Sequence, residues 1–182
     1  MPRPQRNWDV AVDNSFITEQ LDYNVDTERS MAEAQIRDLN DGQRAAFERI
    51  VQSIENHQGQ LFFVDGPGGT GKTFLYDTLC HKLRAESRVV LCVASSGIAS
   101  LLLPGGRTAH SRFKIPVEHL TSDSVCSVDK QSRYAAMLRL AADGAIIWDE
   151  AANQHRWAPE AVDRLFRDLL NSDQPFGGVT VI

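Results

Sequence analysis

Apolar residues recur at helical spacing along several parts of the chain. Between residues 46 and 54 they occupy positions 46, 47, 50, 51 and 54. This stripe predicts a helix, and we expect Asp41 to be its N-cap. The other predicted helices are 72–86, 97–103, 132–142 and 158–170. The short helix 97–103 is expected to end at the run Pro104-Gly105-Gly106.

Between these helices lie short runs in which nearly every residue is apolar. Such runs are typical of strands that are buried on both faces of a sheet. The predicted strands are 60–65, 89–93, 145–148 and 179–182. Strands that alternate with helices predict an α/β fold, in which a parallel sheet carries helices on both faces.

The first 30 residues lack this pattern, because their apolar side chains are scattered among polar ones. We expect an extended arm there. The chain then divides into an N-terminal arm and approach helix, residues 1–38, and one domain, residues 39–182. With 42% apolar residues in 182, the chain suits one domain with its own core. No apolar run approaches the ~20 residues that span a membrane.

The predicted strand 60–65 runs directly into a glycine-rich loop with the spacing G-x-x-x-x-G-K-T. This order of strand, loop and helix is that of the phosphate-binding loop of nucleoside-triphosphate enzymes. Glycines let the backbone wrap closely around an anion, toward which the loop amides then point. We expect Lys72 to reach the β- and γ-phosphates and the Thr73 hydroxyl to ligate Mg²⁺. The candidate nucleotide-binding residues of the loop are Gly66, Pro67, Gly68, Gly69, Thr70, Gly71, Lys72 and Thr73.

Two carboxylates, Asp149 and Glu150, follow the predicted strand 145–148. In open α/β sheets the carboxyl ends of the strands form the edge where ligands bind. Asp149 is suited to hold Mg²⁺, and Glu150 to orient and polarise an attacking water. The pair favours hydrolysis, since a small-molecule kinase needs no dedicated water activator. Lys72, Asp149 and Glu150 are therefore the candidate catalytic residues.

The net charge and the spacing of the cysteines restrict the classes of function that the chain can have. A formal net charge of -5 argues against a domain that coats duplex DNA by bulk charge, but it allows a narrow groove for a single strand. Residues 101–120 oppose the overall sign, with three basic side chains and one acidic. The three cysteines give neither a disulfide framework nor a zinc spacing, and they suit a reducing compartment.

Five stretches together resemble the petite-integration-frequency (Pif-type) DNA helicases of superfamily 1, especially the eukaryotic, transposon-associated branch. They are 39–47, 65–73, 94–111, 148–151 and 175–178. The third begins Ala94-Ser95-Ser96-Gly97 and ends Thr108-Ala109-His110-Ser111, a pattern that a generic phosphate-loop enzyme has no reason to carry. The resemblance covers roughly residues 16–182. It implies a RecA-like P-loop NTPase domain that binds ATP, Mg²⁺ and single-stranded DNA.

The resemblance also implies roles for single residues. Gln43 matches the glutamine that reads the adenine edge, where an amide offers both a donor and an acceptor. From the residues alone, a solvated helix glutamine fits as well. The candidate DNA-binding residues are Ser95, Ser96, Arg107, Thr108, His110 and Ser111. Their hydroxyls and basic groups could bond phosphates, although an ordinary helix-and-loop connection also has polar ends.

Two features depart from the family pattern. Ala152 and Asn153 stand where the family usually has Pro-Met, which leaves the local geometry after Glu150 open. The sequence also stops at Ile182, before a Gly-Asp-x-Arg-Gln run that senses the γ-phosphate. The second motor domain, which carries the arginine finger, would lie beyond it. We therefore expect most of the first RecA-like motor domain, incomplete at its C-terminus.

The implied activity is ATP hydrolysis coupled to 5′-to-3′ translocation on single-stranded DNA and to duplex unwinding. DNA repair, recombination and telomere maintenance are the processes it implies, at an intracellular, nuclear location, with the mitochondrion as the alternative. Two other interpretations stay open. One is a non-catalytic nucleotide- or DNA-binding relic of a truncated helicase. The other is a different phosphoryl transferase built on the same loop.

Overall fold

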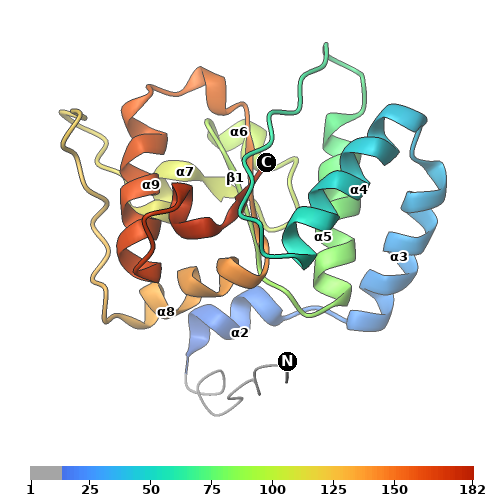
Figure 1. Ribbon diagram of the computed structural model, residues 1–182, viewed down its shortest axis with the longest axis horizontal. Coiled ribbons are helices and arrows are strands. Elements are labelled where there is room, and N and C mark those ends of the chain that lie inside the picture. Colours follow the sequence, from blue (N-terminus) through green and yellow to red (C-terminus); the bar gives the residue numbers. More distant parts are fainter. Residues whose placement is uncertain (1–13) are drawn as a thin grey trace.

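The computed structural model describes residues 14–182, and it places a parallel sheet between two layers of helices (Figure 1). The strands are β1 (Val90–Ala94), β2 (Arg107–Thr108), β3 (Ala145–Asp149) and β4 (Thr180–Val181). Their order across the sheet is β2-β1-β3-β4, and every neighbouring pair is parallel. The predicted α/β fold is therefore confirmed.

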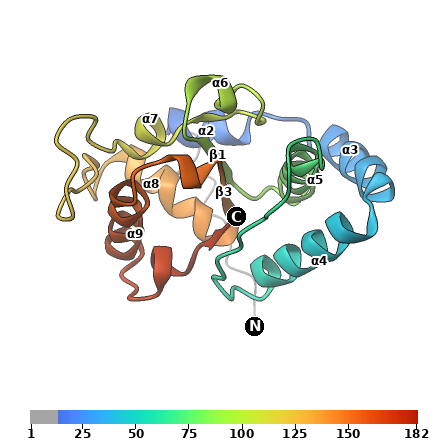
Figure 2. The same ribbon diagram turned by 90° about the horizontal axis from the view of Figure 1, so that it is seen from above.

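The helices divide between the two faces of the sheet (Figures 1 and 2). The α-helices are α2 (Ser15–Leu21), α3 (Val25–Asp38), α4 (Asp41–Glu55), α5 (Lys72–Ala85), α6 (Gly97–Ser100), α7 (Ala109–Phe113), α8 (Arg133–Arg139) and α9 (Trp157–Leu170). Short 3₁₀ turns are η1 (Leu140–Asp143), η2 (Ala151–Asn153) and η3 (Pro175–Gly178). Among residues 14–182, none of the helices has the length and apolar content that crossing a membrane requires.

Alternate residues of the central strands build two separate cores, one on each face. Leu91 and Val93 of β1 pack into the core that contains residues of α7, α8 and α9. Val90 and Cys92 pack into the other core, with residues of α4 and α5. The central strands are thus buried on both faces, which explains why their sequences are continuous apolar runs.

The register of the strands aligns their carboxyl ends. Ala94 pairs with Thr108 on one side and with Asp149 on the other. These three residues therefore form one row across the edge of the sheet at which ligands bind in open α/β folds. A candidate DNA contact and a candidate metal ligand lie in the same row, separated by a single strand.

The predicted strand 60–65 is wrong in extent. Leu61 forms a single parallel bridge with Val181, and the Phe62 amide donates to the Val181 carbonyl at 2.8 Å. Residues 63–69 then leave the sheet without further strand pairing. Among the described residues, the ladder at this edge consists of the Leu61–Val181 bridge.

The extended arm predicted for the first 30 residues is also wrong where the structure describes it. Asn14 caps α2 by accepting from the Phe16 amide, and α2 buries Ile17 in the core. Helix α3 packs against α5, where Glu28 lies 2.6 Å from His81. Scattered apolar residues are sufficient to form these two helices, because each helix buries only a narrow stripe of side chains. Residues 1–13 lie outside the described part of the chain.

The N-cap of α4 is Asn40, and Asp41 is the first helical residue, which corrects the prediction by one position. The Asn40 side chain accepts from the Gln43 amide at 2.9 Å, and the Asn40 amide donates to Gln43 Oε1 at 3.0 Å. This reciprocal pair is a capping box. The sequence contained its signal, an Asn followed three residues later by a Gln.

Candidate functional site

A cavity of about 340 Å³ lies where the glycine-rich loop meets the carboxyl end of β3. Lys72, Asp149 and Glu150 all line this cavity, together with Asp65 and Tyr76. The three residues predicted to be catalytic are therefore brought together, although 76 residues lie between Lys72 and Asp149 in the sequence. Helix α5 supplies the lysine, the last residue of β3 supplies Asp149, and Glu150 follows directly.

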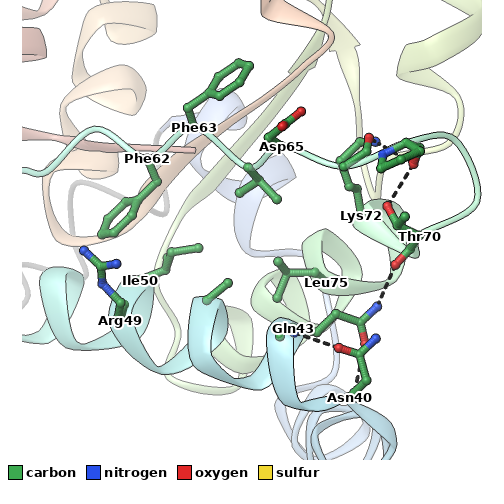
Figure 3. A pocket seen from close by; sticks show the side chains of 15 residues that line it. Asn40, Gln43, Arg49, Ile50, Phe62, Phe63, Asp65, Thr70, Lys72 and Leu75 are labelled. Carbon is green, nitrogen blue, oxygen red and sulfur yellow. Dashed lines mark hydrogen bonds between the residues drawn. The ribbon is translucent and has the colours of Figure 1, made fainter.

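Two glycines of the loop adopt a backbone conformation that favours glycine. Gly69 and Gly71 adopt φ of 82° and 81°, a left-handed conformation that a side chain would strain. A Cβ on Gly71 would come within 2.4 Å of Gln43 Nε2, so a larger residue there would also displace the Gln43 side chain. The Lys72 ammonium donates to the carbonyls of Gly66 at 2.5 Å and Pro67 at 3.3 Å (Figure 3). Its charge is thus held at the mouth of the loop, within reach of a bound phosphate.

Gln43 lies on a second cavity of about 550 Å³, between α4 and the loop (Figure 3). Its Nε2 donates to the carbonyls of Thr70 and Gly71, both at 3.2 Å. Its Oε1 accepts from the Asn40 amide. The structure confirms that Gln43 contacts the loop, but both ends of its amide are bonded to protein. Adenine recognition by Gln43 stays a prediction, and it would require these bonds to be exchanged.

The electrostatics of the cavity depend on partial burial of Asp149. Burial raises the pKa of the Asp149 carboxyl, and the charge of Glu150 raises it further. The hydrogen bond from the Glu150 backbone amide and the charge of Lys72 lower it, but the net pKa is raised. The phenol of Tyr76, which is 5% exposed, has its pKa raised to about 12 by burial and by the charge of Asp149. Tyr76 is therefore a neutral hydrogen-bonding group beside the acids. The cavity holds negative charge that lacks full compensation from protein, which suits it to a cation.

We expect Asp149→Asn to raise the midpoint of thermal unfolding at neutral pH when nucleotide and metal are absent. The pKa of Asp149 is raised on folding, so the ionised carboxylate costs stability at neutral pH. The cost disappears as pH falls below the ordinary carboxyl range, and asparagine keeps the oxygen that accepts from the Glu150 amide. Melting curves across pH measure the difference. Asp123→Asn, in an exposed loop, is the control, and an equal gain there would contradict the explanation.

Glu150 occupies a special backbone position directly after β3. Its φ of 53° and ψ of 34° are left-handed, and they turn the chain into η2. The Asn153 side chain donates to Glu150 Oε2 at 3.2 Å, and the Asn153 amide donates to the Glu150 carbonyl at 2.9 Å. The chain therefore forms an ordered turn here, although Ala152-Asn153 stand where the family usually has Pro-Met. Asn153 holds the carboxylate that is expected to act on water.

The donor set fits Mg²⁺ better than a closed metal centre. Among the described residues, no group of three or more His, Cys, Asp or Glu side chains could hold a metal ion by itself. Mg²⁺ usually takes one or two protein carboxylates and completes its shell with waters and substrate phosphates. Asp149 faces the cavity, and Thr73 lies in the first turn of α5, directly after Lys72. Thr73 is half-buried and is not part of the cavity wall in this state.

The candidate DNA-binding residues gather at the same edge of the sheet. Ser95 and Ser96 follow β1, and Thr108 ends β2. Ser96 caps α6 and Thr108 caps α7, where its hydroxyl accepts from the Ser111 amide at 3.2 Å. A capping hydroxyl already has one partner, so the exposed amides of these turns are the freer groups for a phosphate.

The two basic members of the set have protein partners. Arg107 forms an ion pair with Glu19 of α2, and both side chains are about half exposed. His110 Nδ1 lies 3.3 Å from Gln154 Nε2. The structure therefore places all six residues near one edge without testing DNA binding. Nothing in a single sequence could have indicated the Glu19 or Gln154 contacts, because they depend on the folded arrangement.

The model of the PIF1-like helicase family matches residues 38–182, which is most of the chain. The chain belongs to this family. The ATP-dependent DNA helicase PIF1 of Trypanosoma brucei brucei (strain 927/4 GUTat10.1) is 30% identical over 146 residues, 80% of this chain and 14% of that protein. Pif1 of Psychrobacter sp. (strain PRwf-1) is 30% identical over 125 residues, 68% of this chain and 18% of that protein. This family member thus spans less than a fifth of the length of either relative.

Solved Pif1 structures, the first of them from Bacteroides sp., share the fold of this PIF1-like chain. The complex with ADP-AlF4 has a TM-score of 0.56 and 29% identity, over 74% of this chain and 30% of that one. A structure titled for DNA unwinding at forked duplexes by two coordinating Pif1 helicases has a TM-score of 0.60 and 28% identity, over 79% of this chain and 32% of that one. The expected RecA-like helicase fold is confirmed.

Proposed function

We propose that this chain is the part of a DNA helicase motor that binds and hydrolyses ATP. The observation that carries the proposal is the single cavity lined by Lys72, Asp149 and Glu150, in a member of the PIF1-like helicase family. Curated relatives are named ATP-dependent DNA helicases, and one Bacteroides Pif1 structure holds ADP-AlF4. The chain covers a small part of those proteins, so the activity of the whole protein belongs to the proposal.

Each residue of the cavity has a defined task in this proposal. The loop amides and Lys72 hold the phosphates, for which the ammonium exchanges the Gly66 and Pro67 carbonyls for phosphate oxygens. Glu150 orients the attacking water and accepts its proton. Asp149 and Thr73 would hold Mg²⁺, which neutralises developing phosphate charge when bound.

We also propose that single-stranded DNA lies across the carboxyl edge of the sheet, over Ser95, Ser96, Arg107, Thr108, His110 and Ser111. Support comes from the row Thr108, Ala94 and Asp149, in which Thr108 lies one strand away from an acid of the cavity. A related Bacteroides Pif1, 28% identical with a TM-score of 0.56, is described as bound to single-stranded DNA. In this proposal Arg107 must leave Glu19 to neutralise a phosphate.

Opposite changes in the Arg107–Glu19 pair should move DNA affinity in opposite directions. Arg107→Ala is expected to weaken single-stranded DNA binding and to reduce the slope of log affinity against log salt by ~0.7, the value for one phosphate contact. Glu19→Gln should strengthen binding, because it releases the guanidinium. Fluorescence anisotropy over a salt series measures both. Arg37→Ala, exposed on α3, is the matched control. Unchanged affinity and slope in both Arg107 and Glu19 variants would remove Arg107 from the DNA path.

A comparison of ATP affinity with the rate of ATP hydrolysis distinguishes a hydrolysing motor from a non-catalytic relic. In the full-length protein, the proposal expects Mg·ATP binding and repeated turnover. A relic that only binds nucleotide or DNA would show binding without turnover. Within residues 14–182, Lys72 is the one cationic side chain that lines the cavity at Asp149. We therefore expect a polypeptide of residues 1–182 alone to hydrolyse ATP barely, since a second cation is worth ~10³–10⁵ in rate in comparable enzymes.

The cellular setting stays a prediction from the resemblance. The resemblance also carries three further predictions: Mg²⁺ as the metal, 5′-to-3′ polarity, and roles in DNA repair, recombination and telomere maintenance. A nuclear location, with the mitochondrion as the alternative, is predicted on the same basis.

A further inference from the structure

Two hydrogen bonds join side chains from three elements beside the nucleotide cavity. The indole Nε1 of Trp148 donates to Gln154 Oε1 at 3.0 Å, and Gln154 Nε2 lies 3.3 Å from His110 Nδ1. Trp148 is the β3 residue directly before Asp149, and it is 5% exposed. Gln154 directly follows η2, and His110 lies in α7. The chain of contacts therefore links the strand of the catalytic acids to the helix that carries a candidate DNA contact.

The chemistry of the three groups fixes the direction of both bonds. An indole N–H only donates, so the Gln154 atom that faces Trp148 must be the oxygen. The amide nitrogen of Gln154 then faces His110 and donates. Because an NH₂ group cannot accept, His110 Nδ1 must be the acceptor. A neutral imidazole whose Nδ1 accepts carries its proton on Nε2.

We propose that Gln154 is a positioning residue that holds His110 as the Nε2–H tautomer, ready to donate to a DNA phosphate. This inference rests on the proposed function, because it takes single-stranded DNA as the ligand. Nε2 lies on the far side of the ring from the atom that Gln154 contacts, and His110 is partly exposed. Trp148 orients the Gln154 amide, and Gln154 orients the imidazole and selects its proton position. The neighbouring Thr108 and Ser111 then complete a set of donors along the same turn.

Packing between α7 and β3 supports this chain of contacts. Phe113 of α7 packs on Trp148, with ring centroids 5.7 Å apart, so α7 and β3 already share a core. The Trp148 indole is buried and needs an acceptor, which Gln154 supplies. A purely structural role for Gln154 would need only this bond to Trp148. In the proposal, the bond to His110 also determines which imidazole nitrogen carries the proton.

The first test reads the tautomer directly. Long-range ¹H–¹⁵N spectra of the imidazole nitrogens distinguish a protonated Nδ1 from a protonated Nε2. Wild-type protein should show His110 as the Nε2–H form. Trp148→Phe keeps Gln154 and His110 but removes the donor that orients the amide, so the Nδ1–H form should become populated. A wild-type His110 protonated on Nδ1, or a tautomer unchanged in Trp148→Phe, would overturn the proposal.

The second test measures whether Gln154 acts through His110. Gln154→Met keeps length and volume but forms neither bond, and it should weaken single-stranded DNA binding by about threefold or more, a size typical of coupled neighbours. In a His110→Ala background the same substitution should have no further effect. Gln52→Met, exposed on α4, controls for the glutamine-to-methionine change. Equal losses in both backgrounds would overturn the inference, while absence of DNA binding by wild-type protein would overturn the proposed function itself.

Discussion

Replacing Lys72 with alanine is expected to weaken Mg·ATP binding by at least ~100-fold. The ammonium is the one cation of the described residues that lines the cavity with Asp149, and its present partners are two loop carbonyls that a phosphate can replace. A charge-assisted contact to phosphate in such a site is worth about 3 kcal/mol, which is ~100-fold in affinity. Isothermal calorimetry with a slowly hydrolysed ATP analogue measures the loss.

A lysine on the same helix separates this effect from a general loss of charge. Lys82, in the last turn of α5, forms a salt bridge with Glu86 at 2.6 Å, away from the loop. Lys82→Ala should leave nucleotide affinity unchanged. Melting curves of both variants show whether the loop change also affects the fold. Wild-type affinity in a folded Lys72→Ala protein would refute the assignment of the loop.

Glu150→Gln should leave ATP binding intact and reduce hydrolysis by about 10²–10⁴-fold, the usual contribution of a general base. The amide oxygen of glutamine can still accept from Asn153, so the turn after β3 is kept. What is lost is the ability to accept a proton from water. Steady-state turnover and nucleotide affinity of the full-length protein give the two quantities.

The matched control is Glu55→Gln, an exposed position at the end of α4 that lines neither cavity. It should hydrolyse ATP at the wild-type rate. A Glu150→Gln protein that is equally active would show that another group activates the water.

The sequence predicted most of the elements whose formation depends on local sequence pattern. Continuous apolar runs marked β1 and β3 to within one residue, because strands buried on both faces tolerate little else. The loop and α5 were predicted closely, since positive φ at Gly69 and Gly71 and the helix start at Lys72 follow from the motif itself. The approach of Lys72 to the two acids followed from the rule for the carboxyl edge of a parallel sheet.

What escaped prediction depends on partners far along the chain. Residues 63–65 have the composition of a strand, but strand pairing also needs a neighbouring strand, and in the range 60–65 Leu61 is the residue that forms a bridge. Helix α3 is the predicted approach helix, but it begins at Val25, inside the segment predicted to be extended. It is polar with one narrow buried stripe around Ala32, so its start depends on packing against α5. The contacts of Gln154 with Trp148 and His110 join positions 6 and 44 residues apart, and no periodicity reports them.

The most direct measurement of the central claim is the ATP hydrolysis rate of the full-length protein with and without single-stranded DNA, in parallel for wild type and Glu150→Gln. The account predicts that DNA raises the wild-type rate and leaves the Glu150→Gln rate near background, because Thr108 of the proposed DNA edge and Asp149 lie in one row of the sheet. Wild-type hydrolysis that is the same with and without DNA, under conditions in which the DNA is bound, would contradict it.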